Sequence, residues 1–102
     1  MLVDYVFAEK ARHDVGAIVD FLIEDSPRAA ELFIVRLEAG IERIRRHVHI
    51  GPAALETGIA DMRRISLSPY VLYHFARPEL AQIVRVLHSA REIANIEFMS
   101  EG

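Results

Sequence analysis

Apolar and polar positions alternate with two different periods along this chain of 102 residues. Residues 2–7 alternate with a period of two and place Val3, Tyr5 and Phe7 on one face, which predicts a short strand. From Ala8 onward the apolar residues recur every three or four positions, which predicts a helix. The apolar stripe of this helix consists of Ala11, Val15, Ile18 and Leu22, with Phe21 beside it.

A second helix is predicted to begin directly after the first. Ser26 is a suitable N-cap because its hydroxyl can accept from a free backbone N–H, and Pro27 suits the first helical position. The helical pattern then continues to about His47. Because the break between the two helices is so short, we expect them to lie antiparallel as a helical hairpin. The apolar stripe of the second helix consists of Ala30, Phe33, Ile34, Leu37, Ile41 and Ile44.

Three strands are predicted in the second half of the chain, after a loop. They span residues 62–67, 70–76 and 81–88, and the first turn is Ser68-Pro69. Such close spacing predicts an antiparallel meander. The element order is therefore β-α-α-β-β-β, and the predicted fold class is α+β, with a helical hairpin packed on one face of an antiparallel sheet.

Composition limits the classes of protein that fit this pattern. The length is that of one domain, so we predict that residues 1–102 form a single domain. Twelve basic and 15 acidic residues give a net charge of −3, which argues against a general nucleic-acid binder. No apolar run approaches the length of a membrane span of about 20 residues. The N-terminus has no basic segment typical of a signal peptide, so we expect a cytoplasmic protein.

Several kinds of chemistry have no support in the sequence. The chain has no cysteine, which excludes disulfides and thiolate metal sites. It has no phosphate-binding loop, dinucleotide fingerprint or Gly-x-Ser-x-Gly motif, and no cofactor is predicted. His47 and His49 alternate, but a zinc site needs at least a third ligand, so no metal is predicted either.

The last predicted strand ends on a histidine followed by an arginine. Alternation places Val84, Val86 and His88 on one face, and Arg91 falls just beyond the strand end. A histidine titrating near neutral pH beside arginines could form an acid/base and phosphate-clamping site. A purely structural role is the alternative, in which His88 caps the sheet and Arg91 is solvated.

Two adjacent arginines begin the strand at residues 62–67. Arg63 and Arg64 point to opposite faces of that strand, and structural ion pairs are the simplest role for both. If their strand runs parallel to the last one across the central strand, we expect His88 to approach the beginning of the strand that holds them.

Four segments, in order, resemble the ParE branch of the RelE/ParE toxin superfamily of type II toxin–antitoxin modules. "AEKARHDVGAIVDFL" is similar to the family's opening, and "SPRAAELF" is similar to the start of its second helix. "MRRISLSPYVLYHF" resembles its arginine-then-aromatic strand pair. "IVRVLHSARE" is the most specific segment, since it is close to the Val-x-His-x-x-Arg ending typical of ParE-like members.

This resemblance implies a plasmid-stabilisation type toxin that inhibits DNA gyrase by binding it and is neutralised by a cognate antitoxin. It implies no cofactor and no chemistry of its own. The target-binding candidates are Arg63, Arg64, His88 and Arg91. The candidates for antitoxin binding are Phe21 and Phe33, because the antitoxin is expected to cover apolar surface of the helical hairpin. A place in the core is the equal alternative for both residues.

Two alternatives remain open at this point. A RelE-like nuclease would cleave mRNA on the ribosome, with Arg64, His88 and Arg91 as a reduced catalytic set. An inactive binding module on the same fold is the second alternative. Lys10 is the only lysine, no tyrosine or lysine follows His88, and the chain is net acidic, all of which favours the gyrase-directed toxin over an enzyme.

Overall fold

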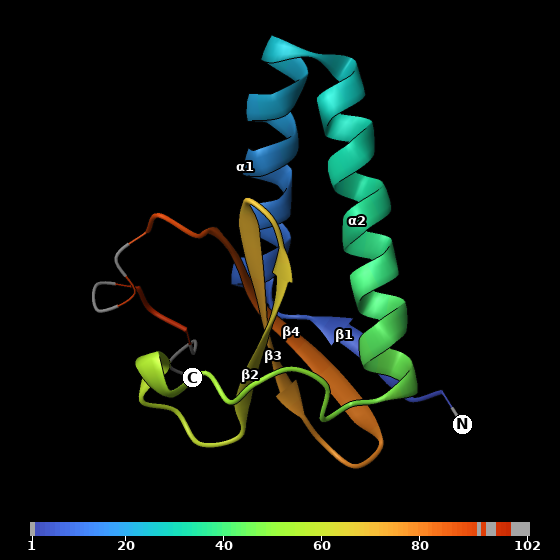
Figure 1. Cartoon of the computed structure of the whole chain (residues 1–102), viewed down its shortest axis with the longest axis vertical. Helices are drawn as coiled ribbons and strands as arrows, with labels where there is room; N and C mark the ends of the chain where they lie inside the picture. The colour runs from blue at the N-terminus through green and yellow to red at the C-terminus, as the bar shows by residue number, and fades with distance from the viewer. Residues whose placement is uncertain (1, 92, 94–95, 99–102) are drawn as a thin grey trace.

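A computed structural model of the chain describes residues 2–91, 93 and 96–98. Its elements follow the predicted order, and two helices pack on a four-stranded sheet (Figure 1). The α+β fold class is therefore confirmed. The elements are β1 Asp4–Phe7, α1 Glu9–Asp25, α2 Pro27–Arg46, the short 3-10 helix η1 Leu55–Thr57, β2 Met62–Leu67, β3 Tyr70–Ala76 and β4 Leu80–His88.

The sheet is mixed rather than antiparallel throughout. Its strand order is β1-β4-β3-β2, so the last strand lies between the first and the third. Strands β2, β3 and β4 form the predicted antiparallel meander, whereas β1 pairs parallel with β4 in the register Tyr5↔Ala81. The next strand after β1 is β2, which lies at the opposite edge of the sheet, so the helical hairpin and the segment that follows it together connect the two edges.

Ser26 alone separates the two helices. Its backbone N–H donates to Leu22 O and so ends α1, while its side-chain oxygen accepts from Ala29 N at 3.4 Å and begins α2. Pro27 occupies the first position of α2, where a missing N–H costs nothing. The predicted antiparallel hairpin is confirmed, and its tip extends beyond the β2–β3 turn (Figure 1).

Each face of the sheet is covered by different parts of the chain. The helices cover one face, where Ile65, Leu72 and Ile83 pack against α2 residues such as Leu37 and Ile44. The segment between α2 and β2 and the residues after β4 contribute to the cluster on the other face, which consists of Ala54, Met62, Tyr73, Phe75, Val84, Leu87 and Phe98. Within the described residues, neither helix is both long and apolar enough to cross a lipid bilayer.

A bulge in β4 changes the face to which its side chains point. The register passes from Tyr73↔Arg85 to His74↔Ile83, so Val84 has no residue opposite it. As a result Val86 packs in the helical-face cluster and Val84 packs in the cluster on the opposite face. The prediction that Val84, Val86 and His88 share one face is therefore wrong for Val84.

The two mid-helix glycines have opposite surroundings and so offer a paired stability test. A Cβ at Gly16 would meet nothing within 4 Å, whereas a Cβ at Gly40 would lie 2.9 Å from Leu67 Cδ2. We expect Gly16→Ala to raise the free energy of unfolding by about 0.5–1 kcal/mol, because alanine favours the helix. We expect Gly40→Ala to lower it by about 1–3 kcal/mol through overpacking. Urea unfolding measures both, and changes of the same sign would contradict the assigned packing.

Candidate functional site

Both arginines at the start of β2 hold the segment that precedes this strand. Arg63 Nη1 donates to Gly51 O at 2.7 Å. Arg64 Nη1 donates to Glu56 Oε1 at 2.7 Å and to Ala53 O at 3.3 Å. Their guanidinium groups therefore already have partners within the chain. The expected ion pair is found for Arg64, with Glu56, whereas Arg63 contacts a backbone carbonyl instead.

Glu56 connects Arg64 to a tyrosine of the next strand. The hydroxyl of Tyr73 donates to Glu56 Oε2 at 3.4 Å, while Arg64 contacts the other carboxylate oxygen. Burial, followed by the negative charge of Glu56, raises the pKa of Tyr73 above its ordinary value. A phenol held protonated beside a carboxylate is a hydrogen-bond donor and not a base. This network therefore fixes the segment before β2 to the sheet and provides no acid/base chemistry.

His88 lies exposed at the end of β4. Its Nδ1 accepts a hydrogen bond from the Ala90 N–H at 3.0 Å, and its ring packs edge-on against Tyr70 with centroids 5.5 Å apart. Because Nδ1 is the acceptor, the neutral ring carries its proton on Nε2. His88 can therefore donate a hydrogen bond to a partner through Nε2, and taking up a proton as a base would require the Ala90 contact to break.

The structure does not bring His88 to Arg63 and Arg64. Strand β2 does run parallel to β4, but the register pairs Tyr70 with both Leu67 and His88, so the ends of these two strands lie together. The arginines are at the opposite end of β2. The expectation that His88 approaches the beginning of β2 is wrong. Since β2 and β4 run parallel, the C-terminal end of β4 lies beside the C-terminal end of β2 and away from its N-terminal end.

The neighbours of His88 are the β2–β3 turn and Arg91. Ser89 N donates to Pro69 O at 2.9 Å, and Arg91 N donates to His88 O at 3.0 Å. Both His88 and Arg91 are exposed. This end of the sheet therefore offers a histidine and an arginine to a partner. Among the described residues, no group of three or more histidine, aspartate or glutamate side chains is arranged to hold a metal ion.

The two phenylalanines predicted to face a partner lie in different environments. Phe21 is 69% exposed near the end of α1. Phe33 is 4% exposed and packs edge-on against Tyr70, with ring centroids 5.1 Å apart. Phe33 is therefore a core residue, the alternative considered for it, and its choice as an antitoxin-binding candidate is wrong, because the face of α2 that carries it is turned to the sheet. Other exposed apolar residues of the hairpin are Ile23, Leu32 and Val35.

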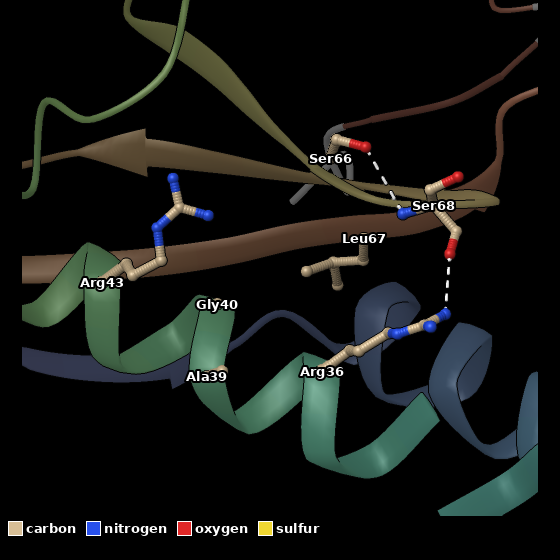
Figure 2. A pocket seen from close by; sticks show the side chains of 7 residues that line it. All are labelled: Arg36, Ala39, Gly40, Arg43, Ser66, Leu67 and Ser68. Atoms are coloured by element: carbon tan, nitrogen blue, oxygen red, sulfur yellow. Dashed lines mark hydrogen bonds between the residues drawn. The ribbon is translucent and has the colours of Figure 1, made fainter. Parts of the chain in front are cut away.

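A groove between α2 and β2 contains basic residues that were not among the sequence candidates. Arg36 and Arg43 lie two turns apart on one face of α2, on the side of the helix that faces Ser66 and Ser68 (Figure 2). Arg36 Nη1 donates to Ser68 O at 3.0 Å, and Arg43 extends toward the strands. Their spacing of seven residues was a usable signal, but the sequence does not reveal which strand they face.

Asp14 and Arg85 form the best-shielded ion pair of the described residues. Arg85 Nε and Nη2 donate to the two oxygens of Asp14 at 2.7 and 2.8 Å, and Val86 N also donates to Asp14 at 3.1 Å. These hydrogen bonds raise the pKa of Arg85 above its ordinary value. Arg85 Nη1 also donates to Glu97 O at 2.6 Å. The pair therefore fixes α1 to β4 and holds the segment that follows β4.

His74 is fully buried in the central part of β3. Its Nε2 lies 3.1 Å from Val48 O, so Nε2 carries the proton, and no partner for Nδ1 is found among the described residues. Burial lowers the pKa of His74, and the neighbouring charge of Arg63 lowers it further, although the Val48 contact acts in the opposite direction. His74 is therefore a neutral core residue.

The lowered pKa of His74 predicts a loss of stability in acid. In the unfolded chain the imidazole takes up a proton near pH 6.5, whereas in the folded chain it does so at lower pH. The unfolded state then binds more protons, so the free energy of unfolding falls as the pH drops below 6.5. Denaturant unfolding between pH 7.5 and 5 measures this slope. We expect His74→Leu to flatten it, and an unchanged slope in that variant would assign the effect to other groups.

The comparisons with known proteins place this arrangement in a family. Residues 5–93 match the family model described as the ParE toxin of the type II toxin–antitoxin system parDE. The match runs from β1 to beyond the end of β4. This chain belongs to the ParE toxin family. An antitoxin protein is accordingly the partner that membership of this family indicates for the toxin.

Two relatives of this ParE-family toxin bear different names. Toxin RelE2 of Caulobacter vibrioides is 29% identical over 86 residues, which cover 84% of this chain and 94% of the relative. A solved chain of the chromosomal ParDE toxin–antitoxin system from P. aeruginosa has a TM-score of 0.68. It is 17% identical, with coverage of 85% of this chain and 96% of that chain. At that identity the likeness establishes the fold.

Proposed function

We propose that this toxin acts by binding DNA gyrase and is neutralised by its cognate antitoxin in the cytoplasm. The match to the ParE family over residues 5–93 is the observation that carries the proposal. His88 and Arg91, at the exposed end of β4, are the target-facing residues we favour. Arg63 and Arg64 contribute indirectly, since their guanidinium groups hold the loop before β2.

The geometry around His88 supports binding over catalysis. The Nδ1 atom is engaged with Ala90, and the arginines at the start of β2 lie at the other end of the strand. A ribonuclease would need a base within hydrogen-bond reach of the ribose hydroxyl and a cation on the phosphate. Of the predicted site residues in the described part of the chain, Arg91 is the one close enough to His88 to bind a phosphate beside it.

Cleavage of mRNA on the ribosome is the second candidate. One observation favours it, namely the RelE name of the Caulobacter relative. In that case Arg64, His88 and Arg91 would have to act together, although the first lies apart from the other two in the free protein. An inactive binding module on the same fold is the third candidate.

A supercoiling assay tests the gyrase proposal. The antitoxin-free chain is incubated with gyrase, relaxed plasmid and ATP, and we expect lost supercoiling or trapped cleaved plasmid. Since His88 would be a recognition residue, His88→Ala should weaken the effect without abolishing it. Arg28→Ala is the matched control, because Arg28 is a solvated arginine at the start of α2.

Two results would contradict the proposal. No effect on gyrase from a folded sample, combined with cut transcripts in cells that express the toxin, would support the nuclease. No effect on gyrase, transcripts or growth would support the inactive module.

A further inference from the structure

The large apolar residues that are exposed gather mainly in two places. One group lies on the helical hairpin and consists of Phe21, Ile23, Leu32 and Val35. The other group lies at the β1 edge of the sheet, is between 41% and 47% exposed, and consists of Leu2, Tyr5, Val6 and Leu80. The hairpin group is the apolar surface expected to face the antitoxin. The group at β1 lies at the other end of the sheet order from β2, and no partner has yet been assigned to it.

Strand β1 is an edge strand, so one side of its backbone has no neighbouring strand. Val3, just before β1, directs its backbone groups to that side, where its N–H donates to Arg45 O and its C=O accepts from Arg45 Nε. Strand geometry repeats this direction every second residue, so the N–H and C=O of Tyr5 and Phe7 point outward too. The alternation agrees with Ala8, whose N–H donates inward to β4.

The outward backbone groups of Tyr5 and Phe7 have no partner in the described part of the chain. The open stretch is short, because the end of α2 occupies the edge at Val3 and α1 begins at Glu9. Each copy of the chain therefore presents two free donors and two free acceptors. Apolar side chains border them on both faces of the sheet, since Phe7 packs with the helical-face cluster and Val6 points to the opposite face.

We propose that two copies of this toxin pair through β1, antiparallel across a two-fold axis at Val6, to form one continuous sheet. In this register Tyr5 of each copy lies opposite Phe7 of the other, and each of these two pairs exchanges both of its backbone hydrogen bonds. The Val6 side chains of the two copies meet on the axis, between the two pairs. The inference goes beyond the proposed action on gyrase, because it concerns the association of the toxin with itself and holds for any target.

This register is the one that uses all of the free groups. Pairing Tyr5 with Tyr5 of the second copy would place Phe7 opposite Val3, whose backbone groups are already bonded to the end of α2. Pairing Phe7 with Phe7 would place Tyr5 opposite Glu9, which belongs to α1 and not to the strand. The pattern of free and occupied groups on β1 is therefore complementary to itself about Val6.

A second copy suits this edge better than a different partner. A longer strand from another protein would find no further backbone groups to pair with, because the edge is closed at Val3 and ends at α1. Asp4 is the charged residue of β1, and in the proposed register it lies opposite Ala8, so the two Asp4 carboxylates do not meet. Leu80 pairs with Asp4 in the sheet and extends the apolar contact around Val6.

Analytical ultracentrifugation of the antitoxin-free chain measures this association. We expect the average molar mass to rise toward that of a dimer between about 5 and about 500 µM, because so short a contact is small for a stable interface. Val6→Asp places two carboxylates on the two-fold axis and should weaken the association at least about tenfold. Val35→Asp is the matched control, since Val35 is 62% exposed on the hairpin, and should associate as the wild type does.

A cysteine cross-link tests the register independently of affinity. The chain has no cysteine, so Val6→Cys introduces a single thiol. Opposite residues of a non-hydrogen-bonded antiparallel pair have Cα atoms about 4.5 Å apart, which a disulfide can span. We expect mild oxidation to cross-link Val6→Cys at least about tenfold faster than Asp4→Cys, whose two thiols would belong to residues about 13 Å apart. Both replaced residues are exposed, so both variants should fold.

Hydrogen exchange read by NMR identifies the edge that pairs. As the concentration of the chain rises, the amides of Tyr5 and Phe7 should exchange more slowly, because strand pairing protects their N–H groups. The amide of Ser66 lies on β2, at the other edge of the sheet, and should exchange at the same rate throughout.

Three results would overturn the inference. The first is a folded chain that stays monomeric over the whole concentration range. The second is an association that Val35→Asp abolishes and Val6→Asp leaves unchanged, which would place the contact on the hairpin. The third is a cross-link of Asp4→Cys as fast as that of Val6→Cys, or protection of Ser66 instead of Tyr5, which would assign a different register or a different edge.

Discussion

Phe33→Ala is expected to lower the free energy of unfolding by about 3–5 kcal/mol, the range for removing a large aromatic side chain from a well-packed core. Phe33 is 4% exposed and packs against Tyr70 across the contact between α2 and the sheet. Such a loss is comparable to the whole stability of a small domain, which is about 5–15 kcal/mol. Urea unfolding followed by circular dichroism measures the change.

Phe21→Ala is the matched control for that variant. The same side chain is removed from the same helical hairpin, but Phe21 is 69% exposed, so we expect a change within about 0.5 kcal/mol. The two variants also separate folding from partner binding. If Phe21→Ala weakens binding of the antitoxin while it leaves stability unchanged, the exposed face of the hairpin is a partner surface. Equal destabilisation by both variants would contradict the burial assigned to them.

Asp14→Asn is expected to lower the free energy of unfolding by about 3 kcal/mol, near the lower end of the range for breaking a buried ion pair. The side chains of Arg85 and Asp14 are 13% and 12% exposed, so the remaining arginine would be largely desolvated without a counter-charge. The near-isosteric asparagine isolates the loss of charge from a loss of packing. At about 4 °C or more per kcal/mol for a domain of this size, the melting temperature should fall by at least about 12 °C.

Glu31→Gln provides the control for the charge change. Glu31 pairs with Arg28 at 3.7 Å on the surface of α2, and their side chains are 70% and 75% exposed. Because solvent screens such a pair, we expect a change in the free energy of unfolding within about 0.5 kcal/mol. If Asp14→Asn were as mild as this control, Asp14 would contribute packing rather than charge to the joint between α1 and β4.

Local patterns account for the elements that could be predicted from the sequence. The change of period near Ala8, the Ser26-Pro27 start of α2 and the Ser68-Pro69 turn each reflect interactions between residues close in the chain. For that reason β2 and β3 were predicted with the same bounds as the structure has. The parallel pairing of β1 with β4 depends on residues more than 70 positions apart, and no local pattern reports it.

The candidate site was harder to predict because it depends on register. The sequence places Arg63, Arg64 and His88 on strands, but only the pairing of Tyr70 with both Leu67 and His88 shows that the arginines lie at the other end. The bulge at Val84 likewise changes which face of the sheet the side chains of β4 point to, and no glycine or proline in the sequence signals it. For Phe33, the helical spacing gave the correct stripe and the hairpin was correctly predicted to pack on the sheet, but Phe33 was also chosen as an antitoxin-binding candidate, although it belongs to the stripe that the sheet buries.

The position of β4 has a consequence for the synthesis of this toxin in the cell. Of the four strands in the described part of the chain, the one that contacts both β1 and β3 is made last. Until it emerges, β1 has no neighbour in the sheet and α1 lacks the arginine that pairs with Asp14. We therefore expect nascent chains that stop before residue 80 to be unfolded and harmless, so that toxicity begins only after β4 has been synthesised.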